Sequence, residues 1–228
     1  MKVLLKLEVR QVNHVNDDPW QEFQEGVKYI LHHRLFLTLI LLSWISMFFG
    51  TSYVQIMPLF ADMLQSAEQG YGLLISATGV GSIIGNLFIS RYQKSRKLGI
   101  MMLSSAAMAP CSLIGFSLVA WILAGTVGAF WLACCFAILT AALSSVFMVS
   151  SMTVLQIKVP DAFRGRVMGI HSITFSMISL GGLAAGVLAA QFSAPIAVVI
   201  GAFVVLSSVI WVLFNVREIA KLDLNILS

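Results

Sequence analysis

The sequence predicts an all-α integral membrane protein with six transmembrane helices. Hydrophobic residues make up 59% of the 228 residues and charged residues only 11%, whereas a soluble domain carries roughly 25% charged residues. Two long stretches, from Leu98 to Ile157 and from Val167 to Val216, contain no Asp, Glu, Lys or Arg. A water-soluble core does not need charge-free stretches of this length, but a lipid bilayer does. Composition therefore predicts the class before any motif is considered.

Six apolar segments are long enough to cross a hydrocarbon core of roughly 30 Å, which takes about 20 residues. Pro110 is tolerated within one of them because neighbouring helices can satisfy the freed backbone groups. The expected organisation is a cytoplasmic linker with an amphipathic helix (1–34), the six-helix bundle (35–216) and a cytoplasmic tail (217–228). The predicted spans are Leu35–Met57, Leu73–Ser90, Leu98–Val119, Val127–Ser151, Val167–Ala190 and Ile196–Asn215.

The basic residues predict the orientation of the bundle. Lys and Arg lie before span one, between spans two and three, between spans four and five, and after span six, and the alternate loops contain none. Six spans place all of them on one side of the membrane, whereas five or seven would scatter them across both. By the positive-inside rule that side is cytoplasmic and holds both termini. The net charge of +4 is therefore a topology signal, and no nucleic-acid partner is expected.

A repeated pattern of small residues indicates an internal repeat. Span two contains Gly81 and Gly85, and span five contains Gly182 and Gly186, each pair at the spacing that lets two membrane helices approach closely. Each pair lies in the middle member of a group of three spans. Because three is odd, the two groups must run in opposite directions through the membrane. This predicts two inverted three-helix repeats, the arrangement from which secondary transporters are built; taken alone, the glycine pairs are also compatible with chance.

Three segments resemble a known family. They are Glu25–Ile30 before the first span, Gly70–Leu74 entering the second and Val159–Gly169 between the fourth and fifth. On these residues the chain resembles the C-terminal six-helix half of a major facilitator superfamily transporter, in the transmembrane secretion effector branch that includes enterobactin exporters and macrolide efflux proteins. The loop after span two also resembles a superfamily motif, but Ser90 stands where that motif usually has Asp, which puts the motif's charge contact in doubt.

The resemblance implies a function and a partner. It implies secondary-active export of drug-like or siderophore-like molecules by alternating access, in the bacterial cytoplasmic (inner) membrane. Such transporters have about twelve helices in two six-helix halves. A second half, as a separate chain or as a homodimer partner, is therefore expected besides the lipid bilayer and a small amphiphilic substrate. The alternative is a non-transporting six-helix subunit, or an inactive transporter fragment, that binds or regulates a partner.

Candidate substrate-binding residues follow from helical faces on the first and fourth spans, which line the cavity in the family. An aromatic and polar face suits a bulky amphiphilic substrate. The alternative is that the hydroxyls bond across helices or to their own backbone, and that the aromatic rings pack in lipid. The candidates are Trp44, Phe48, Thr51 and Gln55 on span one, and Thr140, Ser144, Phe147 and Ser151 on span four.

The basic segment between spans four and five is a candidate cytoplasmic latch. Asp161 is expected to cap the N–H groups that follow it, and Gly165 to form a tight turn between Arg164 and Arg166. One interpretation is that these charges only set the orientation of the spans in the membrane. The resemblance implies more: Asp161, Arg164 and Arg166, with Arg91 of the preceding basic loop, would form contacts between halves that break and re-form as access alternates.

The membrane-embedded part of the spans contains no carboxylate, so this chain offers no intramembrane acidic proton acceptor of the kind that pumps use. His171, one turn inside the fifth span, is the nearest ionisable candidate, with either a packing role or a role in coupling. No enzyme, cofactor or metal site is expected. An embedded hydrolase would need acids within the spans, and Cys111, Cys134 and Cys135 lie in apolar segments without metal-ligand spacing.

Overall fold

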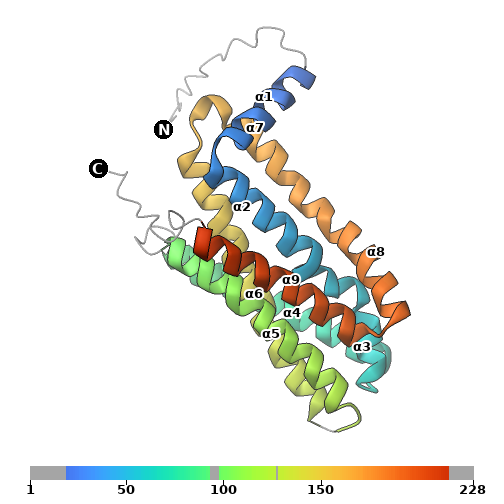
Figure 1. The fold of residues 1–228 in the computed structure, drawn as a ribbon. Coiled ribbons are helices and arrows are strands. Elements are labelled where there is room, and N and C mark those ends of the chain that lie inside the picture. The colour runs from blue at the N-terminus through green and yellow to red at the C-terminus, as the bar shows by residue number, and fades with distance from the viewer. Residues whose placement is uncertain (1–18, 93–97, 127, 216–228) are drawn as a thin grey trace, which may run out of the picture.

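The computed structural model of the protein describes residues 19–92, 98–126 and 128–215, and no strand occurs in these ranges. The loop cations Lys94, Arg96 and Lys97 and the predicted tail (217–228) lie outside the described residues, as does most of the predicted linker (1–34). Figure 1 shows the helices in chain order. They are α1 (Pro19–His32), α2 (Arg34–Ile45), η1 (Ser46–Thr51), η2 (Ser52–Ile56), α3 (Met57–Met63), α4 (Ala67–Tyr92), α5 (Leu98–Ile122), α6 (Ala129–Lys158), α7 (Asp161–Ser172), η3 (Ile173–Phe175), α8 (Ser176–Gln191) and α9 (Ala194–Asn215).

The structure confirms the six predicted spans. Each is long and apolar enough to cross a membrane, and most extend several residues beyond the predicted bounds. Successive spans run antiparallel, so the described Lys and Arg residues gather at the end of the bundle that carries α1 and α7, here called the basic end. The observed spans are Arg34–Met63, Gln69–Tyr92, Leu98–Ile122, Ala129–Lys158, Asp161–Gln191 and Ala194–Asn215.

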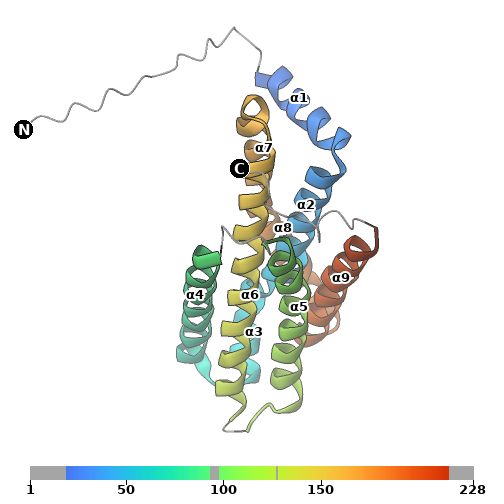
Figure 2. The same ribbon diagram turned by 90° about the vertical axis from the view of Figure 1, so that its left-hand side faces the viewer.

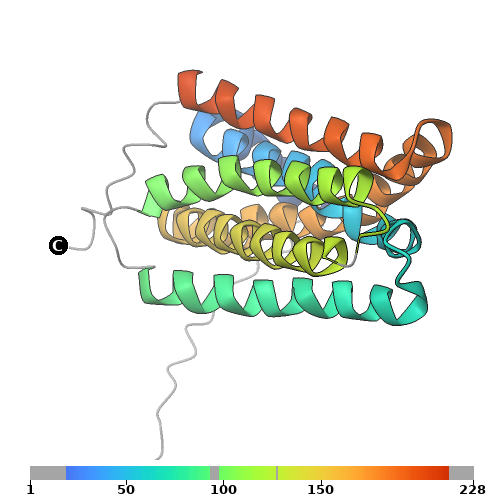
Figure 3. The same cartoon turned by 90° about the horizontal axis from the view of Figure 1, so that it is seen from below.

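The helix contacts follow the pattern expected of two inverted three-helix repeats. Span two (α4) packs on span four (α6), and span five (α8) packs on the middle of span one (η1 and η2). Span three (α5) contacts span four, span six (α9) contacts span one, and α5 and α9 contact each other. Exchanging the first three spans with the last three maps these contacts onto one another. Figures 2 and 3 show the result, with α6 between α4 and α5.

Close helix approach at glycine holds span two against span four. A Cβ atom at Gly81 would collide with the backbone carbonyl of Ile138, and one at Gly85 with that of Ala142. Because hydrocarbon gives no hydrophobic drive for helix association, such backbone contact supplies dispersion energy that larger residues would prevent. The two glycines therefore set the distance between α4 and α6.

Span five approaches span one through a different pair of glycines from the pair that the sequence suggested. A Cβ atom at Gly181 would meet the carbonyl of Phe48, and one at Gly182 would meet the side chain of Gln55. No atom lies within 4 Å of the Cβ position at Gly186. In the described structure the close contact is therefore made by adjacent residues, and Gly186 lies outside it.

Buried apolar side chains form two clusters, one toward each end of the bundle. The cluster at the basic end includes Ile30 of α1 together with Leu39 and Leu155, and the opposite cluster includes Phe60 and Phe116. The fold is therefore packed at both ends. The irregular segment η1, which interrupts the first span, lies between them and beside the cavities described below.

Candidate functional site

A groove lined by both polar and apolar side chains opens on one side of the bundle, between the first, second, fourth and fifth spans. Its volume is about 340 Å³, at the lower end of the 300–1,000 Å³ typical of small-molecule sites. Besides Tyr53, six of its lining residues carry a hydroxyl or an amide group. These six residues are Thr51, Thr78, Ser82, Asn86, Ser144 and Ser145. The name polar groove is used for this surface below.

Asn86 is the most polar group in the groove. Its side chain is exposed, and it has no hydrogen-bond partner among the described residues. It lies in α4 next to Gly85, whose close contact with α6 places this part of α4 against the fourth span. A primary amide that faces hydrocarbon without a hydrogen bond costs several kcal/mol, roughly 2–7. The groove therefore needs a polar ligand, water or another protein surface against it.

The predicted face on the first span is divided by irregular backbone. The segment η1 is a π-helix and η2 is a 3-10 helix, so the rotation per residue departs from that of the α-helix on which the prediction rested. Thr51 reaches the polar groove, whereas Phe48 lines a small pocket toward α8 and α9. Trp44 packs against the cluster at the basic end, and Gln55 lies over Gly182. These four side chains do not form one surface.

Two of the four candidates on the fourth span make hydrogen bonds between helices. The Thr140 hydroxyl donates to Ser112 Oγ at 2.9 Å, and Ser151 and Ser43 share a bond at 3.2 Å. Both Thr140 and Ser151 are almost completely buried. These two hydroxyls therefore follow the alternative to substrate binding, which is hydrogen bonding across a helix interface in hydrocarbon. Ser144 differs, since it lines the polar groove.

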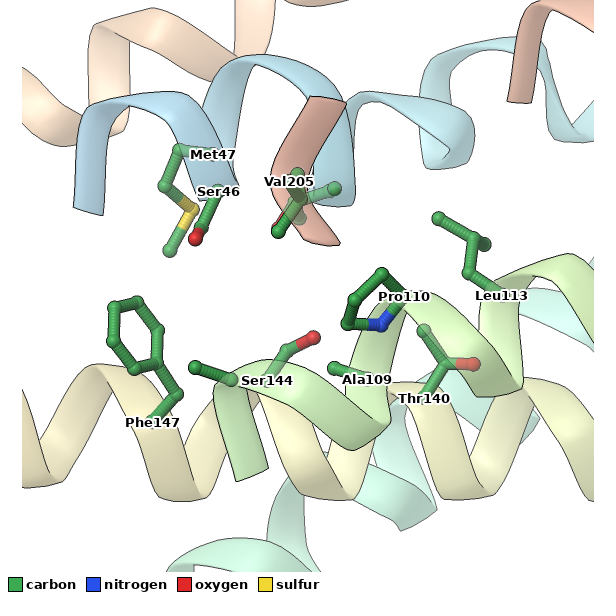
Figure 4. A pocket seen from close by; sticks show the side chains of 12 residues that line it. Ser46, Met47, Ala109, Pro110, Leu113, Thr140, Ser144, Phe147 and Val205 are labelled. Atoms are coloured by element: carbon green, nitrogen blue, oxygen red, sulfur yellow. The ribbon is translucent and has the colours of Figure 1, made fainter. Parts of the chain in front are cut away.

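Ser144 and Thr51 also line a small pocket inside the bundle, together with Phe147. Figure 4 shows Ser144 and Phe147 of α6 converging with Pro110 of α5 and Met47 of η1. The pocket has a volume of about 20 Å³, which is room for about one water molecule. It is too small for a substrate in this conformation. Thr51 and Ser144 are thus the two sequence candidates that connect the interior with the polar groove.

Most residues of the polar groove were not predicted, because the predicted faces lay only on spans one and four. Thr78, Ser82 and Asn86 lie on span two at intervals of four residues and so share a helical face. The sequence signal that could have identified this face is an amide within an apolar span, preceded by hydroxyl residues at intervals of four. Phe175 and Ile178 of the fifth span complete the wall, and their position depends on the 3-10 turn η3, which sequence periodicity does not reveal.

The predicted latch residues make contacts within this chain. Asp161 pairs with Arg164 at 2.7 Å, and Arg166 pairs with Glu25 at 2.5 Å and with Glu22 at 3.6 Å. Two expectations were wrong: Asp161 makes no capping hydrogen bond, since Pro160 occupies the N-cap position, and Gly165 lies inside α7 rather than in a turn. Both follow from α7 beginning directly after Pro160.

Arg91 takes no part in these contacts. It lies exposed in the last turn of α4, and no ion pair joins it to another described residue. His171 is buried, with Nδ1 3.5 Å from the Thr174 hydroxyl and with no partner for Nε2 among the described residues. No group of three His, Cys, Asp or Glu side chains that could hold a metal ion occurs in the described part of the chain.

The bundle thus consists of six antiparallel apolar spans in two inverted triplets, with a polar groove between four of them. The family model of the transmembrane secretion effectors matches residues 3–227. The chain belongs to this family. The transmembrane secretion effector family is a branch of the major facilitator superfamily, and the match covers nearly the whole chain. No curated protein and no solved structure matched the chain.

The matched family is the one that the sequence resemblance predicted. The chain is an integral membrane protein of a transport family whose members are generally not enzymes. In this transmembrane secretion effector the segment Val159–Arg166 leads from the end of α6 into the first turns of α7, at the basic end of the bundle. The polar groove lies on the first, second, fourth and fifth spans.

Proposed function

We propose that the chain forms one wall of the translocation path of a secondary-active exporter for drug-like or siderophore-like amphiphilic molecules, with a second six-helix half as the other wall. The observation that carries this proposal is the polar groove. It presents the Asn86 amide at the depth of the membrane, where lipid cannot satisfy it, whereas the Thr78 and Ser82 hydroxyls beside it donate to carbonyls of their own helix. An opposing half that closes a hydrated path over the groove removes this cost.

The size of the groove supports a second wall. A site for a drug-like molecule encloses most of the ligand surface, whereas this groove is open on one side and holds about 340 Å³. It therefore contacts one side of a bulky ligand. Aromatic and thioether groups, Phe175 and Met148, lie beside the hydroxyls in its lining. This mixture suits an amphiphilic substrate, whose apolar surface needs packing and whose polar groups need a few donors and acceptors.

The group that couples transport to an ion gradient is proposed to lie in the partner half. The membrane-embedded part of the spans has no Asp or Glu, and proton-driven transporters commonly use an intramembrane carboxylate. If the driving ion is a proton, the carboxylate lies in the second half. This chain would then supply a substrate-binding surface, while its partner responds to the gradient.

The contacts at the basic end are proposed as the cytoplasmic latch of this half. Arg166 joins α7 to α1, and Asp161 and Arg164 add a pair one turn earlier in the chain. Because α7 continues through η3 into α8, these pairs hold the cytoplasmic end of a groove-lining span. An exposed ion pair contributes about 1 kcal/mol or less to stability. Such a pair can therefore break and re-form during a transport cycle.

The proposed location is the bacterial inner membrane with both termini in the cytoplasm. The described cations lie at the basic end, and positive residues are retained on the cytoplasmic side during insertion. The positions of α1 and of the latch on the cytoplasmic face follow from this orientation.

The test is efflux of a fluorescent amphiphilic dye from cells that co-express the chain with candidate first halves. Asn86→Leu and Ser144→Leu should each reduce efflux at least roughly fivefold, since each removes a polar contact of the groove, worth about 1–3 kcal/mol. Ser207→Leu is the matched control. This serine lies on α9, is exposed and is satisfied by the carbonyl of Phe203.

Equal efflux by the wild type and the Asn86 and Ser144 variants would contradict the role of the groove. Efflux that never exceeds the empty-vector level with any first half, or with the chain alone, would contradict transport. That second result would favour a six-helix subunit that binds or regulates a membrane partner.

A further inference from the structure

A second groove lies between α4 and α5, and its lining is apolar. Its volume is about 310 Å³, and α6 forms its floor. Figure 2 shows α4 and α5 on either side of α6. Its lining includes Gly85, Phe88, Ser104, Ser105, Met108 and Leu139. The name apolar groove is used for it below.

The apolar groove offers no free hydrogen-bonding side chain. Its two hydroxyls donate to the backbone of their own helix, Ser104 to the Met101 carbonyl at 3.1 Å and Ser105 to the Met102 carbonyl at 2.9 Å. This contrasts with the polar groove, where the Asn86 amide has no partner among the described residues. Gly85 and Asn86 are adjacent in α4, so the helix separates a polar surface from an apolar one. The apolar groove therefore suits hydrocarbon rather than a polar ligand.

The side chains along the apolar groove are exposed although they are hydrophobic. Phe88 is 50% exposed, Met108 55% and Leu139 45%. All three belong to spans that cross the membrane, so the surrounding medium is lipid. A concave apolar surface at this depth is filled by a flexible chain, because an unfilled space forfeits dispersion contacts along its lining.

The end of the apolar groove nearest the basic end carries groups suited to a lipid headgroup. Phe88 lines the groove, and its ring lies 5.0 Å from that of Tyr92, one turn further along α4. Arg91 lies in the same turn, exposed and without an ion pair to another described residue. Tyr at the membrane interface and an Arg facing an anionic leaflet are the usual protein partners of phospholipid headgroups.

We propose that the apolar groove is a binding site for an anionic phospholipid, with an acyl chain between α4 and α5 and the phosphate of the headgroup at Arg91. The site is separate from the polar groove and does not depend on transport. Since Gly85 contributes to the groove and also contacts α6, a bound chain would brace α4, which carries Asn86, against the fourth span.

The test is native mass spectrometry of the full chain, released from nanodiscs that contain equal amounts of phosphatidylglycerol and phosphatidylcholine. The wild type should retain phospholipid and should favour phosphatidylglycerol roughly fivefold, as expected for one interfacial cation. Ser104→Phe fills the groove from its exposed edge and should abolish retention. Arg91→Gln should preserve retention but remove the preference for the anionic lipid.

Two control variants match these changes. Ser207→Phe adds the same ring to an exposed serine of α9, and Arg34→Gln removes an exposed cation at the start of α2; both should behave as the wild type. If Ser104→Phe does not fold, Met108→Trp narrows the same groove from an exposed position. Retention by the groove-filling variant equal to that of the wild type would overturn the proposal. An equal loss of preference in Arg34→Gln and Arg91→Gln would also overturn it.

Discussion

Arg166 of α7 donates a hydrogen bond to Glu25 of α1 at 2.5 Å, across a separation of 141 residues. Glu22 lies 3.6 Å from the same guanidinium, and the rings of Tyr29 and Phe163 stack with centroids 4.4 Å apart. The helix before the first span is thereby fastened to the start of the fifth. Arg166 was expected to contact the other half of a transporter, but in this structure it pairs with Glu25 and Glu22 of its own chain.

Loss of this ion pair should loosen α1. In Arg166→Gln, amide hydrogens of α1 are expected to exchange roughly fivefold faster, because partly exposed ion pairs contribute about 0.2–1 kcal/mol each. Arg164→Gln is the control, since Arg164 pairs with Asp161 and not with α1. The combination of Glu25→Arg with Arg166→Glu should restore protection. Unchanged exchange in Arg166→Gln would show that ring stacking alone holds the helix.

Alanine substitutions should separate the glycines that hold helices together from those that do not. Gly81→Ala and Gly181→Ala place a methyl group against a backbone carbonyl and should destabilise the protein by about 1–3 kcal/mol, as overpacking does. Gly79→Ala and Gly186→Ala, where no atom lies within 4 Å, should be neutral or stabilising by up to about 1 kcal/mol, the gain in helix propensity. The measurement is the thermal unfolding midpoint in detergent; similar midpoints for both sets would contradict the glycine contacts.

Removal of interhelical hydroxyls should affect stability rather than transport. Thr140→Val breaks the bond to Ser112 and Ser151→Ala the bond to Ser43, at a cost of about 0.6–2 kcal/mol each. In the co-expression assay with a first half, both variants should keep the substrate range of the wild type, while Ser144→Ala should change it. The readout is efflux of several dyes alongside the unfolding midpoint. A changed substrate range in Thr140→Val would assign that hydroxyl to the substrate path.

Composition and charge placement were sufficient to predict the six spans, because a bilayer imposes length and hydrophobicity on each helix independently of its neighbours. The spacing of small residues also identified Gly81 and Gly85, which lie in the regular α-helix α4. Sequence periodicity failed where the backbone departs from α-helix. Phe48 and Thr51 both lie in the π-helical segment η1, whose rotation per residue puts them on different surfaces, and no residue type in that segment requires this geometry.

The polar groove was only partly predictable for a related reason. Thr51 and Ser144 could be found from faces of single helices, but the contribution of α4 depends on how α4 lies against α6. The same limit applies to hydroxyls: Thr140 and Ser144 are similar in sequence and one turn apart. Only the packing of α5 against α6 shows that Ser112 accepts from Thr140, while Ser144 remains in the polar groove.

Labelling of single cysteines should establish which side of the membrane each end of the bundle faces. In a protein with Cys111, Cys134 and Cys135 replaced by Ala, Arg91→Cys and Asp161→Cys place thiols at the basic end and Asp62→Cys at the opposite end, all at exposed positions. A membrane-impermeant maleimide should label Asp62→Cys in intact cells. It should label the other two only in inside-out vesicles, because the cations that flank them are retained in the cytoplasm. Labelling of Arg91→Cys and Asp161→Cys from opposite sides would require an odd number of spans between α4 and α7. The antiparallel pairing of α5 with α6, and with it the inverted repeat, would then be excluded.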